Sequence, residues 1–328
     1  MKILVIRFSS IGDIVLTFPV LAAIKHEFPQ AEIHYATKKT FEELLRASAH
    51  IDRVHLLSDS FPAFKRELKS ESFDVVIDLH NNLRSKRLTT GLSGKKVRFS
   101  KLNFKKWLFT TLKWNTLPHV HIVERYLATL KVLNIDSPIK ENKCFIIPEE
   151  SRVNMADSYP SLGKSFVAIA IGAQFQTKRV PKEKWVEILR KTHDSIVVLG
   201  GKMDREMATW IMQQLPEKNI ENACGEWSIL QSSSIVSQAK SVLTNDTGMM
   251  HIAASFDVQI ISIWGNTVPA FGMYPFRPNG ASDDYQFEVK RLSCRPCSKI
   301  GFESCPKKHF ACMNQQNAAE IAASIKEN

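Results

Sequence analysis

Residues 241–254 read S-V-L-T-N-D-T-G-M-M-H-I-A-A, an apolar run that ends in a polar turn and resumes as a helical pattern. A buried strand followed at once by a helix is the unit from which parallel sheets are built. The first backbone N–H groups of such a helix can face an anion, and the helix dipole adds to the attraction. The same turn also suits an ordinary helix N-cap by Asn245, Asp246 or Thr247. The sequence around this turn decides between the two interpretations.

Short apolar strands alternate with helical patterns through the second half of the chain. Strands are predicted at 166–171, 195–199, 242–243 and 259–264, and a helix at 181–192. Fully apolar strands of this length indicate a parallel sheet that is covered by helices on both faces. The second half is therefore predicted to be a Rossmann-like, doubly wound α/β unit.

The first half shows the same alternation. Its predicted strands are 3–8, 32–36, 54–57, 74–79 and 97–99, and its predicted helices are 19–28, 41–47, one from about 82, and 123–133. The pattern loosens at 138–160, and 328 residues exceed one ordinary core. We therefore predict two α/β domains, residues 1–155 and 156–314, with a linker near 150–164 and a C-terminal segment, 315–328, that contains a last helix.

Three turns at strand ends of the second half carry polar groups, and ligands bind at the carboxyl ends of parallel strands. The first turn, G-A-Q-F-Q-T-K-R at 172–179, ends in a hydroxyl and two cations. The second has Gly200-Gly201 with Asp204 and Glu206 nearby, where an acid would accept hydrogen bonds from ribose hydroxyls. The third is the N-D-T-G turn. Together they predict a nucleotide pocket, and three unrelated helix caps are the alternative.

In the first half, the turn after the first strand is R-F-S-S-I-G-D at 7–13. It lacks G-x-G-x-x-G, so an NAD enzyme is not indicated. Asp13 stands at a helix start that is expected to face an interdomain cleft, either as a general base or as a favourable helix-dipole partner. The segment H-N-N-L-R-S at 80–85 brings polar and basic groups to the same edge of the sheet.

The formal net charge of +11 and the pI near 9.3 indicate a polyanionic partner. The excess is concentrated between Arg84 and Lys113, where no acidic residue occurs. Aromatic residues alternate with lysines at 101–114, which is typical of an interfacial helix on anionic lipid, or of an amphipathic helix that faces the core. No nucleic-acid motif accompanies this pattern, so nucleic acid is not an expected partner.

The N-terminus and the hydropathy indicate a cytoplasmic protein. Mean hydropathy is −0.15, and no apolar run approaches the ~20 residues of a membrane span. Arg7 interrupts the first apolar run too early for a signal peptide, so this run is predicted to be a strand.

Four of the six cysteines lie close together in sequence. Cys294, Cys297, Cys305 and Cys312 form C-x2-C-x7-C-x6-C, which predicts a structural zinc site. Packed or redox-labile thiols under a loop are the alternative. Cys144 and Cys224 are predicted to be plain buried thiols.

Several segments together resemble the lipopolysaccharide heptosyltransferase family, glycosyltransferase family 9. They are R-F-S-S-I-G-D-I-V-L-T-F-P-V-L, D-L-H-N-N-L-R-S, G-A-Q-F-Q-T-K-R-V-P, T-N-D-T-G-M-M-H-I-A-A and W-G-N-T-V-P. The distance in sequence from S-I-L at 228–230 to the T-N-D-T-G segment also resembles the family. The resemblance covers nearly the whole chain in the right order. The cysteine segment resembles one found in many members, most often of the heptosyltransferase II type.

The resemblance implies a GT-B fold, with two Rossmann-like domains facing a central cleft and the C-terminal helix returning to the first. It implies an inverting transfer, without a metal cofactor, from an ADP-activated heptose to a phosphorylated, lipid-linked saccharide at the inner membrane face. Asp13 would be the catalytic base, and Lys178 would offset charge on the leaving nucleotide. The implied donor-binding residues are Ser9, Ser10, Gly12, Thr177, Glu206, Trp227, Asp246, Thr247, Gly248 and His251. The implied acceptor-binding residues are Asn82, Arg84 and Lys86.

Three departures from the family pattern fall around the donor pocket. Met249 stands where members often have Pro, Gln231 where they often have Glu, and Asn266 within G-N-T where they have G-P-T. Two other functions therefore stay open: a nucleotide-sugar-binding protein of the same fold without turnover, and a GT-B epimerase of a UDP-sugar.

Overall fold

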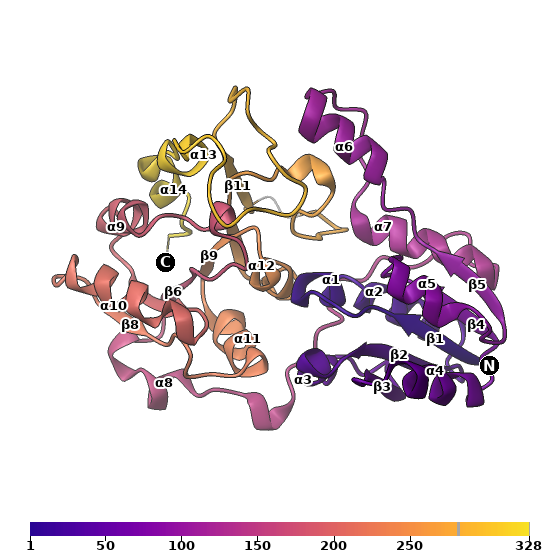
Figure 1. Cartoon of the computed structure of the whole chain (residues 1–328). Helices are drawn as coiled ribbons and strands as arrows, with labels where there is room; N and C mark the ends of the chain where they lie inside the picture. Colours follow the sequence, from indigo (N-terminus) through magenta and orange to yellow (C-terminus); the bar gives the residue numbers. More distant parts are fainter. Residues whose placement is uncertain (281–282, 328) are drawn as a thin grey trace. The chain divides into compact units, whose positions relative to one another are not determined.

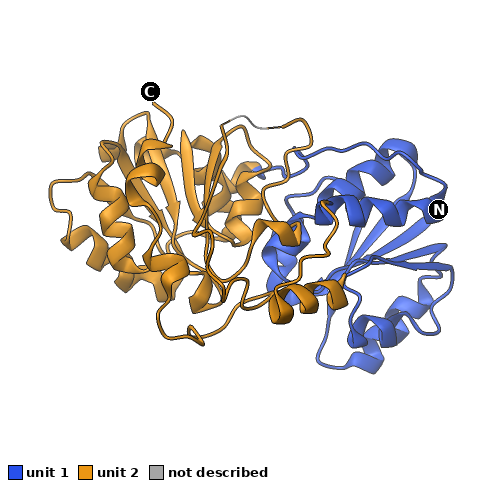
Figure 2. Ribbon diagram, turned by 90° about the horizontal axis from the view of Figure 1, so that it is seen from above, with its two compact units in different colours: residues 1–101, 120–148 blue, residues 102–119, 149–328 orange. Residues whose placement is uncertain are grey.

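The computed structural model describes residues 1–280 and 283–327 (Figure 1). The chain divides into two compact units (Figure 2). Unit 1 comprises Met1–Lys101 and Val120–Pro148, and unit 2 comprises Leu102–His119 and Glu149–Asn328. The predicted domain 1–155 is therefore wrong for residues 102–119. The reason is packing, since Leu117, Leu102 and Phe109 cluster with Val268 and Phe271 of the second half.

Unit 1 is built on a parallel five-stranded sheet with the order β3-β2-β1-β4-β5. Its strands are β1 Lys2–Ile6, β2 Glu32–Lys38, β3 Arg53–Leu57, β4 Val75–Asp78 and β5 Lys95–Arg98. Its α-helices are α1 Ile11–Val15, α2 Phe18–Glu27, α3 Glu42–Leu45, α4 Phe61–Ser70, α5 Leu83–Thr89 and α7 Ile122–Leu127, with 3-10 helices at Lys39–Phe41 and Ala128–Leu133. The strand order reverses between β1 and β4, which makes the carboxyl ends of these two strands the switch point.

The helices of unit 1 change faces at that reversal, because crossover connections in parallel sheets are right-handed. Phe64 and Leu68 of α4 and Leu88 of α5 pack on one face, against Leu4 and Ile6 of β1. Alternate residues of β1, Ile3 and Val5, are fully buried and point to the opposite face. There α2, almost wholly buried, packs against α7. The doubly wound prediction for the first half is confirmed.

Unit 2 is built on a parallel six-stranded sheet with the order β11-β10-β9-β6-β7-β8. Its strands are β6 Phe166–Ala170, β7 Ser195–Leu199, β8 Ile220–Asn222, β9 Ser241–Asn245, β10 Gln259–Trp264 and β11 Tyr285–Glu288. Its α-helices are α6 Asn103–Leu112, α8 Met155–Ser158, α9 Lys182–Arg190, α10 Arg205–Gln213, α11 Ile229–Gln238, α12 Gly248–Ala253, α13 Ala311–Asn314 and α14 Ala318–Ala323, with 3-10 helices at Glu149–Ser151, Pro160–Leu162, Gln176–Lys178, Lys202–Asp204 and Pro269–Phe271. The switch point of this sheet lies between β6 and β9.

Two apolar layers cover the sheet of unit 2. One contains α9, α10, α13 and α14 on residues such as Ile169 and Val198, and the other contains α8, α11 and α12 on residues such as Ala168 and Val242. The predicted return of the C-terminal helix to the first domain is not what the structure shows. Because Ala318 and Ile321 form the apolar side of α14, they are buried against α9 in unit 2.

The helices of the described residues are short. Among them, none combines the length and the apolar character that crossing a membrane requires.

Candidate active site

Arg7 organises the carboxyl end of β1 in unit 1. Its side chain is 9% exposed, and its Nε donates to the backbone oxygen of Ser9 at 2.7 Å. Nη1 donates to the oxygen of Leu79 at 2.6 Å and to the Tyr126 hydroxyl at 3.1 Å. Nη2 lies 2.7 Å from Oδ2 of Asp13. Arg7 thus joins the turns that follow β1 and β4, the two strands at the switch point.

Asp13 is fixed at the start of α1 by two further contacts. The backbone N–H of Ser10 donates to Oδ2 at 3.2 Å and the Ser10 hydroxyl donates to it at 2.9 Å. Burial acts to raise the pKa of Asp13, but Arg7 and the bonds from Ser10 outweigh it, so the pKa is lowered. The side chain is still 21% exposed. Asp13 is therefore an ionised, oriented carboxylate that a ligand can reach.

His80 follows β4 and lies beside these groups. Its ring contacts Phe8 edge-on, with 5.2 Å between the ring centroids. Burial, helped by the charge of Arg7, lowers its pKa to about 3. Within the part of the chain that the structure describes, Nδ1 has no hydrogen-bond partner. His80 is thus a neutral imidazole with an unused polar atom at the switch point.

The predicted acceptor residues lie on α5, directly after this turn. Asn82 caps α5 by accepting a bond from the Ser85 N–H at 2.8 Å. The side chains of Arg84 and Lys86 are exposed. Because Ile6 of β1 pairs with Asp78 of β4, the structure brings α5 to the same sheet edge as Asp13. Asn82 has a structural role there, whereas the two cations are free to meet solvent anions.

Lys178 and Asp246 form the corresponding pair at the switch point of unit 2. Nζ of Lys178 lies 2.6 Å from Oδ2 of Asp246 and also donates to its backbone oxygen at 3.2 Å. The Thr267 hydroxyl donates to the same carboxylate oxygen at 2.7 Å. Asp246 is 6% exposed. The turns after β6, β9 and β10 therefore meet at one carboxylate and one cation.

Thr247 occupies the N-cap position of α12, and its side chain makes no capping hydrogen bond. Gly248 follows it and is half-buried, whereas His251 is buried within the helix at 4% exposure. Asn245, the last residue of β9, does not cap α12. Its Oδ1 accepts a hydrogen bond from the Val180 N–H at 3.1 Å, which joins β9 to the segment that follows β6. Of the predicted donor residues of this turn, Asp246 contacts Lys178 directly.

Thr177 is buried and bound to another loop. Its hydroxyl donates to the Phe302 oxygen at 3.1 Å and accepts from the Phe302 N–H at 2.8 Å. Its own N–H donates to the same oxygen at 3.1 Å. In this arrangement Thr177 fixes the backbone before Lys178, and its hydroxyl is already engaged.

Glu206 and Trp227 lie further along the sheet edge. Glu206 is exposed on the first turn of α10, whereas the nearby Asp204 is buried and pairs with Arg179 at 2.7 Å. Trp227 is half-buried, and its Nε1 donates to the Tyr159 hydroxyl at 2.8 Å. Among the described residues, the hydrogen bonds and ion pair of Lys178 and Asp246 involve neither Glu206 nor Trp227.

The sequence analysis did not identify two residues of the loops near the Lys178–Asp246 pair as site residues. It named Asn266 only as a departure from the family pattern, and it did not name Arg295. Asn266 is 2% exposed, and within the described residues its Oδ1 and Nδ2 have no partner. Arg295 donates to the oxygen of Thr267 at 2.7 Å and to that of Gly265, which fixes the backbone on both sides of Asn266. The position of Arg295 between two cysteines, in C-R-P-C at 294–297, is the sequence feature that could have pointed to it.

The four clustered cysteines occupy different surroundings. Cys294 Sγ lies 3.9 Å from His309 Nε2, and the Cys297 thiol donates to the Cys294 oxygen at 3.0 Å. Cys312 belongs to the apolar core, where burial raises its pKa to about 12. Among the described residues, no three of these thiols satisfy the 4.8 Å mutual spacing of a metal-ligating group. The predicted four-cysteine zinc site stays a prediction.

The basic, aromatic segment forms α6 and the loop that follows it. Phe109 packs inward on Phe271, with 5.9 Å between ring centroids. Other apolar side chains are exposed: Phe104 70%, Trp107 51%, Leu112 59% and Trp114 65%. One side of α6 therefore faces the core, as one interpretation predicts, and another presents apolar groups among lysines to solvent. The contact with anionic lipid stays a prediction.

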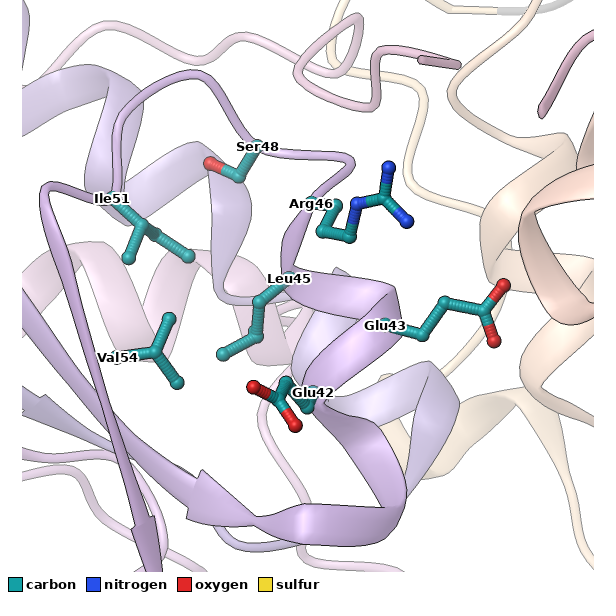
Figure 3. Close-up of a pocket in the computed structure, with 7 residues that line it drawn as sticks. All are labelled: Glu42, Glu43, Leu45, Arg46, Ser48, Ile51 and Val54. Atoms are coloured by element: carbon teal, nitrogen blue, oxygen red, sulfur yellow. The ribbon is translucent and has the colours of Figure 1, made fainter. Parts of the chain in front are cut away.

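A pocket of about 470 Å³ lies elsewhere in unit 1 (Figure 3). Its lining consists of Glu42, Glu43, Leu45, Arg46, Ser48, Ile51 and Val54. In Figure 3 the side chains of Leu45, Ile51 and Val54 point toward one another, and Glu43 points away from them. The pocket contains none of the predicted site residues.

Comparison with known proteins identifies the family. The family model of glycosyltransferase family 9 (heptosyltransferase) matches residues 62–301. The chain is 23% identical over 338 residues to lipooligosaccharide heptosyltransferase 2 of Campylobacter jejuni, which covers 99% of this chain and 98% of that protein.

Two solved structures show the same fold. The glycosyl transferase family 9 protein of Veillonella parvula has a TM-score of 0.77 at 19% identity and covers 98% of this chain and 95% of that one. Heptosyltransferase WaaC of E. coli with ADP-2-deoxy-2-fluoro heptose has a TM-score of 0.67 at 20% identity and covers 92% and 96%. The predicted GT-B fold is confirmed. The chain belongs to glycosyltransferase family 9, the heptosyltransferase family, and is a glycosyltransferase.

Proposed function

We propose that the protein transfers a heptose or a related sugar from an ADP-activated donor to a phosphorylated lipopolysaccharide-core or lipid-linked saccharide, with inversion at the anomeric carbon. The observation that carries this proposal is the ionised Asp13, which Arg7 and Ser10 orient at the switch point of the first sheet. The relative in Campylobacter jejuni is named for lipooligosaccharide, and the E. coli structure holds an ADP-heptose analogue.

In the proposed reaction Asp13 removes the proton of an acceptor hydroxyl. The hydroxyl oxygen forms a bond to the anomeric carbon while the bond from that carbon to the donor phosphate breaks. The electron pair of the broken bond stays on the departing ADP, and the proton stays on Asp13 until solvent removes it. A single displacement of this kind inverts the anomeric centre, and it requires no metal ion because fixed cations can stabilise the leaving charge.

On the donor side, Lys178 supplies that cation. Its side chain is 18% exposed, and its Nζ is anchored by Asp246, so the cation is positioned before the donor arrives. Thr247, Gly248 and the backbone that Thr177 fixes would surround the diphosphate. Met249 lies in the first turn of α12 and Asn266 lies in the turn that follows β10, and at these positions we expect donor preference to differ from that of other members.

On the acceptor side, Arg84 and Lys86 would meet the phosphates of the saccharide. The exposed apolar residues of α6, with Lys105 beside them, would rest on the anionic inner face of the cytoplasmic membrane, where a lipid-linked acceptor is found. Binding to vesicles with and without anionic lipid tests this contact. Trp107→Glu is expected to weaken it, and an unchanged bound fraction would rule it out.

The decisive experiment is sugar transfer with purified protein. ADP-heptose and a phosphorylated core acceptor are incubated with the wild type, with Asp13→Asn, and with Asp136→Asn, an exposed acid of the same unit, as the control. We expect product in the wild type and the control, a loss of about 10²–10⁴-fold in Asp13→Asn, and unchanged donor binding by calorimetry. Wild-type turnover in Asp13→Asn would remove Asp13 as the base.

The same preparation separates the alternatives. Donor binding without product in the wild type would favour a nucleotide-sugar-binding protein. Greater thermal stabilisation by UDP than by ADP would favour an epimerase, because a ligand stabilises the native state in proportion to its affinity.

A further inference from the structure

A pair of histidines is buried at the β2–β3 side of unit 1. His34 of β2 and His55 of β3 are 0% and 1% exposed, and His34 Nδ1 lies 2.8 Å from His55 Nε2. The outer nitrogen of each ring contacts a carboxylate. His34 Nε2 lies 2.8 Å from Glu32 Oε1, and His55 Nδ1 lies 2.6 Å from Glu67 Oε1.

This arrangement leaves two nitrogens facing each other. A ring that donates its outer N–H to a carboxylate presents a lone pair at its inner nitrogen. Two lone pairs at this distance require a shared cation, which is either a proton or a metal ion. Histidines that bind metals usually donate their other N–H to a carboxylate, which fixes the tautomer and the ring orientation. Both rings have that partner here.

Glu71 supplies a third donor group from the segment that follows α4. One ligand atom from each of His34, His55 and Glu71 lies within 4.8 Å of the other two. Lys2 and Arg53 contact the two oxygens of Glu71 at 3.1 and 2.7 Å. Because a carboxylate oxygen has two lone pairs, each oxygen keeps one for a further ligand.

We propose that His34, His55 and Glu71 bind one divalent transition-metal ion of the Zn²⁺ class, which takes the place of the shared proton. Two imidazoles and one carboxylate are a common zinc ligand set. Nitrogens about 2.1 Å from one tetrahedral ion lie about 3.4 Å apart, so binding separates the two rings by roughly 0.6 Å. Water fills the fourth position.

The site serves structure rather than sugar transfer. His34 lies near the start of β2, whereas Arg7 and Asp13 follow the carboxyl end of β1. Elements β2, β3 and α4 lie together in unit 1 (Figure 1), and a metal would join them at one point. Glu32 and Glu67 are 44% and 48% exposed, so the cluster reaches the surface through its carboxylates.

The test is Zn²⁺ binding by full-length protein after removal of metals with a chelator. We expect one equivalent at this site and a higher Tm with Zn²⁺. Glu67→Gln should weaken that equivalent by about 10–100-fold, the usual effect of losing a partner of a ligating histidine, and His55→Gln should abolish it. Glu27→Gln is the matched control, because Glu27 contacts the ring of the single, exposed His26 at 3.1 Å. It should leave binding unchanged.

Co²⁺ distinguishes this site from the cysteines and covers the case in which His55→Gln does not fold. The Co²⁺ spectrum of the equivalent at this site should lack a thiolate charge-transfer band and should persist in Cys294→Ser. Loss of that equivalent in Cys294→Ser but not in Glu67→Gln would overturn the proposal. So would the absence of any equivalent sensitive to Glu67→Gln, which would show that the two rings share only a proton.

Discussion

Nη2 of Arg7 lies 2.7 Å from Oδ2 of Asp13, and the remaining nitrogens of Arg7 are bonded to the turns after β1 and β4. Burial acts to lower the pKa of Arg7, yet Asp13 outweighs it and the pKa is raised. Both groups therefore stay charged, and each holds the other in place. The carboxylate that we propose as the catalytic base is built into the packing of the sheet edge.

Replacing Arg7 should lower the free energy of unfolding of unit 1. In Arg7→Met the carboxylate of Asp13 loses its cation, and the oxygens of Ser9 and Leu79 lose their donor. We expect unit 1 to lose about 3–5 kcal/mol of stability, as when one partner of a buried ion pair is removed. Arg7→Lys keeps the charge but cannot reach all these acceptors, so it should be intermediate. Urea unfolding measures both, and a change below about 1 kcal/mol in Arg7→Met would contradict this role.

Lys178→Met should reduce kcat more than it changes donor binding. Loss of one fixed charge-stabilising group typically lowers the rate by about 10²–10³-fold. Asp246→Asn should lower the rate less, because it frees Lys178 without removing the cation. Lys191→Met, an exposed lysine of the same unit, is the control. Steady-state kinetics check these values, and a Lys178→Met enzyme with normal kcat would show that another cation does this work.

The stability of unit 1 should fall as the pH is lowered from about 6.5 toward 3. The pKa of His80 is about 3 in the folded protein, below the ordinary value of 6.5. Between these values the unfolded chain binds a proton that the folded chain does not, so the contribution of His80 is complete above pH 6.5 and is lost toward pH 3. His80→Asn should flatten this slope in a series of Tm measurements. His26→Asn, whose ring is exposed, should leave the slope unchanged, and equal slopes for His80→Asn and wild type would refute the assignment.

Gly265→Ala should destabilise unit 2 and weaken donor binding together. A Cβ at Gly265 would lie 2.6 Å from the Thr177 oxygen and 2.7 Å from Met313 Cε. Met313 can move, but the Thr177 backbone is bonded to Phe302, so overpacking should cost about 1–3 kcal/mol. Thermal unfolding and ADP calorimetry measure the two effects. Donor affinity that does not change while stability falls would separate Thr177 from the donor site.

The strands that were easiest to predict are those whose residues are buried on both sides. Residues 195–199 and 259–264 read S-I-V-V-L and Q-I-I-S-I-W, which are mostly apolar, and the structure gives β7 and β10 these same limits. The edge strands β8 and β11 carry alternating polar residues such as Glu221 and Gln286, and the sequence analysis did not find them. Edge strands bury little apolar surface, so they leave little hydrophobic pattern.

The candidate site also had parts that a local sequence pattern predicts and parts that it does not. Strand ends are local features, so Asp13, Lys178 and Asp246 could be placed in the turns after strands from the sequence. The partners of these residues are distant contacts. The pairing of Lys178 with Asp246 spans 68 positions, and Arg7 reaches Leu79 across 72. No local pattern encodes which polar groups meet, and Thr177 shows the consequence, since its hydroxyl is bonded to a loop 125 residues away.

The membership of Leu102–His119 in unit 2 has a practical consequence for dissecting the enzyme. The chain changes unit three times, after residues 101, 119 and 148. A fragment ending near residue 148 would carry Phe109 and Leu117 without Val268 and Phe271, and the complementary fragment would expose those two residues. Neither fragment then contains the complete apolar cluster that it has in the full-length protein. Chimeras with other family members should therefore exchange residues 102–119 along with the second half, so that both apolar surfaces come from the same parent.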